Sequence, residues 1–119
     1  MSTDYVAYRK VLEQGLAQLS RELPGPMSGF ARLHRKATAE GALSSSVKEM
    51  MALAISIVAG CEGCIAYHIH DAIEAGASRD ELLETIGVAV LMGGGPASIY
   101  ATRAMEAVDQ FSLVSAEIR

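Results

Sequence analysis

Residues 49–68 read EMMALAISIVAGCEGCIAYH, and this stretch decides both the fold and the candidate chemistry of the chain. An apolar run with the composition of a buried helix leads to a glycine, which would end that helix. Both cysteines of the protein follow in one Cys-x-x-Cys, and a histidine comes one helical turn after the second cysteine. We therefore expect a helical hairpin that brings together two thiols, an imidazole and the carboxylate of Glu49.

The composition predicts a single helical domain that assembles with copies of itself. With 119 residues, the chain fits one domain over residues 1–119. Apolar residues make up 50% of the chain and aromatic residues only 5%, which suits closely packed helices. So much apolar surface on a short chain predicts a buried interface between subunits, and hence a homo-oligomer. The 10 Lys+Arg against 14 Asp+Glu, with no basic run, indicate that nucleic acid is not a partner.

The sequence also predicts a cytoplasmic location. Residues 4–10 are charged from the start, unlike a signal peptide. The longest apolar run, residues 50–60, is shorter than the roughly 18 residues that a membrane helix requires. No membrane partner is therefore expected. In the cytoplasm, a Cys-x-x-Cys is typical of catalytic, redox or metal-binding sites and not of structural staples.

Helical periodicity and turn residues predict an all-α fold of about six helices with no strand. Breaks are expected at Pro24-Gly25-Pro26 and at Gly93-Gly94-Gly95-Pro96. Ser78-Arg79-Asp80-Glu81 has the pattern of a capping box at the start of the fifth helix. The expected helices cover approximately residues 5–22, 26–39, 44–60, 61–76, 78–92 and 96–111.

The spacing of the cysteines and the histidine favours thiol chemistry. At about 100° per residue, Cys61 and His68 fall within roughly 60° of Cys64 on the fourth helix. Free N–H groups and the helix dipole in a first turn stabilise a thiolate. A histidine one turn away can accept or relay the thiol proton. Two structural alternatives remain open: buried cysteines that act as small apolar residues, and a hydrogen-bonded core histidine.

A metal site is a second interpretation of the same residues. Cys61, Cys64, His68 and Glu49 could supply four ligands. A structural zinc usually takes a second Cys/His pair, however, and this chain has no third cysteine. No resident metal or cofactor is therefore expected.

Glu49 itself has two interpretations. If Ser46 is the N-cap, Glu49 completes a capping box and serves only the start of the helix. If Ser44 is the N-cap, Glu49 lies one turn further in and can face the hairpin. Of the other histidines, His34 is interpreted as a packing or interface residue, and His70 as a solvent-facing or interface residue.

The pattern Glu-x11-Cys-x2-Cys-x3-His, from Glu49 to His68, resembles the active-site signature of AhpD-like alkylhydroperoxidases within the carboxymuconolactone decarboxylase family. Further likeness lies at residues 30–34, 41–44, 68–81 and 91–97, so that it covers approximately residues 30–105. The resemblance implies an AhpD-like all-α fold and a homo-oligomer, with trimers and hexamers usual. A hexamer is our expectation.

The resemblance also implies roles for individual residues. Cys64 would attack a hydroperoxide, Cys61 would resolve the product, and His68 and Glu49 would relay protons. An external dithiol, such as a lipoyl group or a thioredoxin-like protein, would restore the thiols. Full AhpD enzymes have a histidine just before the second cysteine, where this chain has Gly63, and this departure predicts poorer proton delivery.

We therefore expect a thiol-dependent peroxidase. Two alternatives use the same scaffold. The first is a dithiol oxidoreductase or redox-responsive protein without peroxidase activity. The second is a carboxymuconolactone-type decarboxylase in which the cysteines are incidental.

Overall fold

A computed structural model describes residues 3–118, and these residues form five helices and no strand. The helices are α1 (Tyr5–Glu22), α2 (Pro24–Thr38), α3 (Ser45–Ala59), α4 (Glu62–Glu74) and α5 (Arg79–Ile118). The expected all-α class is confirmed. The fifth and sixth expected helices are the two parts of α5, which is interrupted at Gly94 by a non-helical backbone (φ 69°, ψ −146°).

The helix starts follow the capping residues of the sequence. The Asp4 side chain accepts a hydrogen bond from the N–H of Ala7 at the start of α1. Before α5, the Ser78 N–H donates to Glu81 at 2.8 Å and the Glu81 N–H donates to Ser78 at 3.1 Å. The predicted capping box is therefore present, and hydrogen bonding of the Glu81 carboxylate to the backbone N–H and the side chain of Ser78 lowers the pKa of Glu81.

Two predicted boundaries differ from the structure. The second helix begins at Pro24, two residues earlier than expected, because proline is tolerated in a first turn, where its missing N–H would have no partner. A single residue, Leu23, separates α1 from α2. The fourth helix ends at Glu74, and Gly76 (φ 104°) adopts the left-handed conformation just beyond it.

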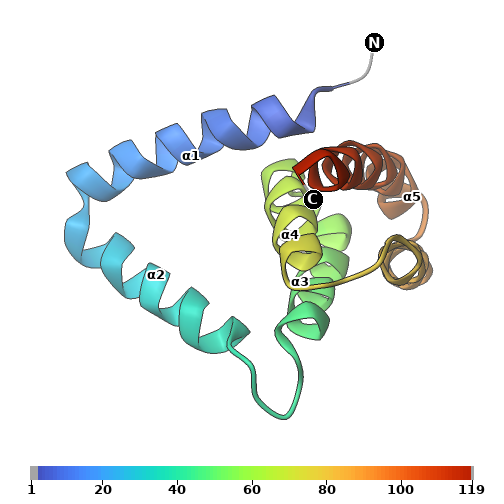
Figure 1. The fold of residues 1–119 in the computed structure, drawn as a ribbon, viewed down its shortest axis with the longest axis horizontal. Helices are drawn as coiled ribbons and strands as arrows, with labels where there is room; N and C mark the ends of the chain where they lie inside the picture. The colour runs from blue at the N-terminus through green and yellow to red at the C-terminus, as the bar shows by residue number, and fades with distance from the viewer. Residues whose placement is uncertain (1–2, 119) are drawn as a thin grey trace.

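The core lies between α3, α4 and α5. Its largest fully buried side chains from these helices are Leu53, Ile57, Ile65, Ile69, Leu82 and Val108. By contrast, α1 contributes only Tyr5 to the core, and α2 has no buried residue. We call residues 5–38 the arm, because Figure 1 shows α1 and α2 (blue to cyan) extending away from the core before the chain returns to it at α3.

The break at Gly94 lets α5 turn across the hairpin. A Cβ at the preceding Gly93 would lie 2.5 Å from the Cβ of Ala97 and 3.3 Å from Cγ2 of Val58, so the chain approaches itself closely there, as expected. By length and composition alone, residues 79–115 could cross a membrane. The longest uninterrupted apolar run in the sequence, residues 50–60, did not indicate this segment. The segment is nevertheless partly a core helix, since Leu82 and Val108 are fully buried.

Candidate redox site

The turn between α3 and α4 places the two cysteines. Gly60 ends α3 in the left-handed conformation (φ 71°), and the Cys61 N–H then donates to the carbonyl of Ser56 at 3.0 Å. Cys61 is the N-cap of α4, and its Sγ accepts a hydrogen bond from the Cys64 N–H at 3.2 Å. The expected helix over residues 61–76 would have placed both cysteines in its first turn. In the structure only Cys64 lies in the first turn of α4, because the helix begins at Glu62.

Cys61 and Cys64 form a disulfide in this structure, with their Cα atoms 5.2 Å apart. Both residues are partly exposed, so that a small molecule can reach the motif from solvent. The pair therefore has the geometry of a dithiol that can be oxidised within one chain.

Glu49 faces the hairpin. The N-cap of α3 is Ser44, whose hydroxyl accepts a hydrogen bond from the Val47 N–H at 3.2 Å. Glu49 consequently lies one turn further in, where it is only 4% exposed. Its Oε2 accepts a 2.7 Å hydrogen bond from Nδ1 of His68 on α4. Of the two interpretations that the sequence left open, the structure favours the carboxylate that faces the hairpin.

The two ring nitrogens of His68 have different roles. Nδ1 is bonded to Glu49, so Nε2 is the nitrogen that remains for proton exchange. Cys64 precedes His68 by four residues on α4, a spacing that makes the two side chains neighbours on the helix surface. Carboxylate, imidazole and thiol thus follow one another from α3 to the start of α4.

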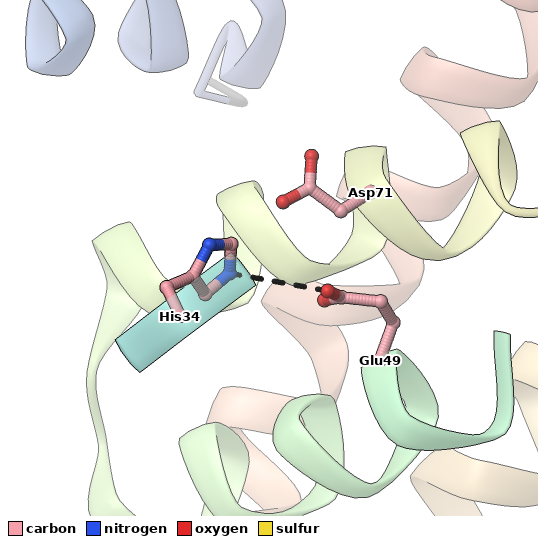
Figure 2. Close-up of side chains that lie close together, drawn as sticks. All are labelled: His34, Glu49 and Asp71. Carbon is pink, nitrogen blue, oxygen red and sulfur yellow. Dashed lines mark ion pairs between the residues drawn. The ribbon is translucent and has the colours of Figure 1, made fainter. Parts of the chain in front are cut away.

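The sequence did not predict two other side chains near Glu49. Figure 2 shows His34 of α2 pointing toward Glu49, with Asp71 of α4 close to both. Nε2 of His34 lies 4.0 Å from Oε1 of Glu49, and one ligand atom from each of the three residues lies within 4.8 Å of the others. His34 therefore also approaches Glu49, a relationship that its interpretation as a packing or interface residue did not include. Asp71 follows His68 by three residues, a spacing that could have identified it.

The third histidine is also held by a carboxylate. Nδ1 of His70 donates to Oδ1 of Asp71 at 2.9 Å, and its ring meets the edge of Phe111, with centroids 5.8 Å apart. His70 is therefore partly buried against α5 and not simply solvent-facing. All three histidines of the chain contact either Glu49 or Asp71.

The arm is hydrogen-bonded to Glu62, one of the two residues between the cysteines. The hydroxyl of Tyr5 donates to Oε1 of Glu62 at 2.8 Å, and Nη1 of Arg103 lies 3.7 Å from Oε2 of the same carboxylate. Burial and the neighbouring Glu62 carboxylate raise the pKa of Tyr5 to about 12. These contacts join α1 and α5 to the first residue of α4.

The position of Gly63 is covered by α1. A Cβ on this glycine would lie 3.0 Å from Cδ1 of Leu12 and 3.6 Å from the hydroxyl of Tyr8. A histidine here, as in full AhpD enzymes, would therefore require the Leu12 side chain to move.

Together, the fold and the site define a small helical protein with a Cys-x-x-Cys hairpin, in which the buried Glu49 is paired with the partly exposed His68. The sequence pattern of the Carboxymuconolactone decarboxylase family matches residues 24–107, and the chain belongs to this family. The AhpD-like arrangement of the hairpin is thereby confirmed.

Comparisons with individual proteins agree with this assignment. A crystal structure of a carboxymuconolactone decarboxylase family protein from Legionella pneumophila is 41% identical, with a TM-score of 0.88 over 93% of this chain and 99% of that one. An uncharacterized protein of Cupriavidus necator is 32% identical over 92% of this chain and 96% of its own length. The alkyl hydroperoxide reductase AhpD of Nocardia farcinica is 34% identical over 50% of this chain but only 33% of its own.

Proposed function

We propose that this protein is a thiol-dependent peroxidase that reduces hydroperoxides through a dithiol/disulfide cycle of Cys61 and Cys64. The observation that supports the proposal best is the 2.7 Å bond between buried Glu49 and His68, one turn from Cys64. A buried carboxylate that holds one imidazole nitrogen leaves the other nitrogen oriented for proton transfer. The likeness to AhpD over half of the chain gives independent support.

The cycle begins at Cys64. His68 accepts the thiol proton, and the Cys64 thiolate attacks one oxygen of the hydroperoxide. The O–O bond breaks, the thiolate sulfur is oxidised to a sulfenic acid, and the leaving alkoxide takes a proton from His68 to give an alcohol. Glu49 stabilises the positive charge that the imidazole acquires between these two steps.

Cys61 then completes the oxidation. Its sulfur attacks the sulfenic sulfur of Cys64, forms the disulfide and releases water. An external dithiol, such as a lipoyl group or a thioredoxin-like protein, is oxidised to its own disulfide and returns both cysteines to thiols. The protein needs no resident cofactor for this cycle. We place it in the cytoplasm, where dithiol reductants keep such a pair in turnover.

The active form in this proposal is a homo-oligomer, in which a hexamer remains our expectation. The outward face of α3 exposes Val47, Met51, Ile55 and Val58, which recur at helical spacing. Val88, Leu91 and Met92 of α5 are also exposed, and a pocket of about 360 Å³ between the two helices is lined by Ile55, Val58, Val88 and Met92, among others. Monomeric proteins rarely expose so large an apolar surface.

A second candidate is a dithiol oxidoreductase that exchanges disulfides with other thiols and does not reduce peroxides. The observation that favours it is the position of Gly63, where the side chains of Leu12 and Tyr8 on α1 lie against the space that a second histidine would need. Without that imidazole, protonation of the alkoxide rests on His68 alone. Disulfide exchange depends less on protonation of the leaving group, because that group is a thiolate and not an alkoxide.

A single-turnover assay separates the two candidates. Fully reduced protein is mixed with a panel of hydroperoxides in the presence of a chelator, and thiol loss is followed with time. The peroxidase proposal expects oxidation well above the rate of a free thiol, and its disappearance in Cys64→Ser. If oxidation by every peroxide matches the free thiol while an oxidised dithiol reacts rapidly, the oxidoreductase is correct.

A further inference from the structure

The cluster of His34, Glu49 and Asp71 brings ligand atoms from three helices into one place beside the redox site. One ligand atom from each residue lies within 4.8 Å of the other two. Figure 2 shows the three side chains converging from α2, α3 and α4. We propose that these residues bind a divalent first-row transition ion of the zinc type.

The charge of the cluster supports a cation at this point. Glu49 and Asp71 bring two carboxylates close together, and among residues 3–118 no lysine or arginine lies within ion-pair distance of either. Their partners are the three histidines, which neutralise them only when protonated. A divalent cation would balance both carboxylates while the imidazoles stay neutral, the form in which histidine binds metals.

Glu49 provides the second, independent observation. Its side chain is 6% exposed, and Oε2 is held by His68. Within the described residues, Oε1 accepts no hydrogen bond, and Nε2 of His34 lies 4.0 Å from it. Among the described residues, the buried side-chain nitrogen or oxygen without a partner is Nε of Arg9, so Oε1 of Glu49 keeps some accessible surface. A water or a cation can therefore reach this acceptor. Figure 2 shows the Glu49 carboxylate pointing toward His34, with Asp71 nearby.

The dimensions fit after a small adjustment. The centre of a triangle whose sides equal the 4.8 Å limit lies about 2.8 Å from each corner, whereas zinc binds nitrogen and oxygen at about 2.0–2.2 Å. Movements of under about 1 Å by exposed side chains would close this gap. The His34 and Asp71 side chains are 44% and 28% exposed, so both can move and water can fill the remaining coordination positions.

The ligand set indicates the kind of ion. One imidazole and two carboxylates are a mixed nitrogen and oxygen set, which favours Zn²⁺, Co²⁺ or Mn²⁺ over Mg²⁺ and Ca²⁺. The Glu49–His68 and Asp71–His70 bonds would hold the carboxylates in place around the ion. This set differs from the cysteine-containing set considered from the sequence, and it leaves both thiols free.

The site has a consequence for the dithiol. An ion on Oε1 would draw negative charge from the carboxylate that supports His68 through Oε2. The reduced protein should then lose thiol reactivity when the ion binds. This second effect rests on the proposed function, whereas binding itself does not.

Calorimetry with tag-free, disulfide-bonded protein tests the site, because no thiol can bind metal in that form. We expect Zn²⁺ to bind at one site per chain, Mg²⁺ to compete weakly, and His34→Gln and Asp71→Asn each to weaken Zn²⁺ binding by at least about tenfold. Asp109→Asn, which changes an exposed aspartate on α5, is the matched control and should bind like wild type. Absence of Zn²⁺ binding, or binding that both site variants retain, would overturn the proposal.

Alkylation of the reduced protein provides the second measurement. Zn²⁺ should slow the reaction of Cys64 with a neutral alkylating agent in wild type but not in Asp71→Asn. Equal slowing in both proteins would show that the thiols bind the ion and would contradict the proposed coupling. Because calorimetry uses the oxidised form, its result is independent of whether the protein is a peroxidase.

Discussion

Nδ1 of His68 donates a 2.7 Å hydrogen bond to Oε2 of Glu49, and this bond joins the two helices of the hairpin near the Cys-x-x-Cys. The two residues are far apart along the chain, and only the reversal at Gly60 brings them into contact. The bond fixes the imidazole in the orientation that presents Nε2 for proton exchange.

The first prediction concerns the charge of Glu49. Glu49→Gln should slow alkylation of Cys64 at neutral pH by roughly three- to tenfold and move its pH profile to higher pH, because glutamine cannot stabilise an imidazolium equally. The free energy of unfolding should change by about 1 kcal/mol or less, since the amide oxygen still accepts the Nδ1 hydrogen bond. Glu84→Gln, an exposed glutamate on α5, is the control. Wild-type thiol reactivity in Glu49→Gln would rule out the relay.

The second prediction ranks the two thiols. Backbone N–H donation from Cys64 favours a thiolate at Cys61, whereas His68 favours one at Cys64. Both contacts stabilise a thiolate, but an imidazolium adds the attraction of opposite charges, which a neutral N–H lacks, so the imidazole should prevail. Mass spectrometry after brief alkylation should find the label mainly on Cys64. When the Cys61→Ser variant is treated with peroxide, a sulfenic acid should accumulate on Cys64. Label mainly on Cys61 would reverse the assignment.

Much of the fold could be predicted from short-range signals. Ser78 and Glu81 cap α5, Gly60 ends α3 and Gly94 breaks α5, because each depends on chemistry within a few residues. The path of the arm could not be predicted in this way. The residues of α2 have helical periodicity but no buried member, so their placement depends on contacts with the rest of the protein.

The site shows the same division. Cys64 and His68 share a helix, and their spacing alone predicted that they would be neighbours. For Glu49, the choice between Ser44 and Ser46 as N-cap was beyond the sequence, because serine is an equally good cap at both positions. His34 comes from α2, outside the hairpin, and no local pattern relates it to Glu49.

A third prediction follows from the buried Tyr5 hydroxyl. Its pKa is raised from 10.0 to about 12, so the folded state favours the protonated phenol. The resulting stability is present below pH 10 and should be lost as the pH rises from about 10 to about 12. Burial also raises the pKa of Tyr67, so absorbance at the phenolate band should show more than one late-titrating tyrosine. Tyr5→Phe should remove the component that titrates at about 12. If Tyr5→Phe instead removes a component that titrates with the ordinary tyrosine pKa of 10.0, the assignment is wrong.

The fourth prediction compares the effect on stability of replacing two glycines of α5, one at the break and one in regular helix. Gly94→Ala should destabilise the protein by about 1–3 kcal/mol, because its backbone (φ 69°, ψ −146°) is accessible almost only to glycine. Gly87→Ala is the matched control, since Gly87 is helical and a Cβ there meets nothing within 4 Å. That change should stabilise the protein by about 0.5–1 kcal/mol. Urea denaturation at equal protein concentration measures both, and equal effects would contradict the strained backbone.

The last prediction concerns the exposed apolar face of α3. Ile55 is 67% exposed in the single chain, next to Val58 and Met92 across the apolar pocket. If a second copy covers this face, a charge there must be buried without a partner in the assembled form, which is unfavourable enough to dissociate the subunits. Ile55→Lys should therefore lower the mass measured by light scattering, while the chain keeps its helical content. Leu113→Lys introduces the same charge at a position that is 64% exposed near the end of α5, and it should leave the mass unchanged. A wild-type monomer at micromolar concentration would exclude the assembly, and an Ile55→Lys protein of wild-type mass would exclude this face as its interface.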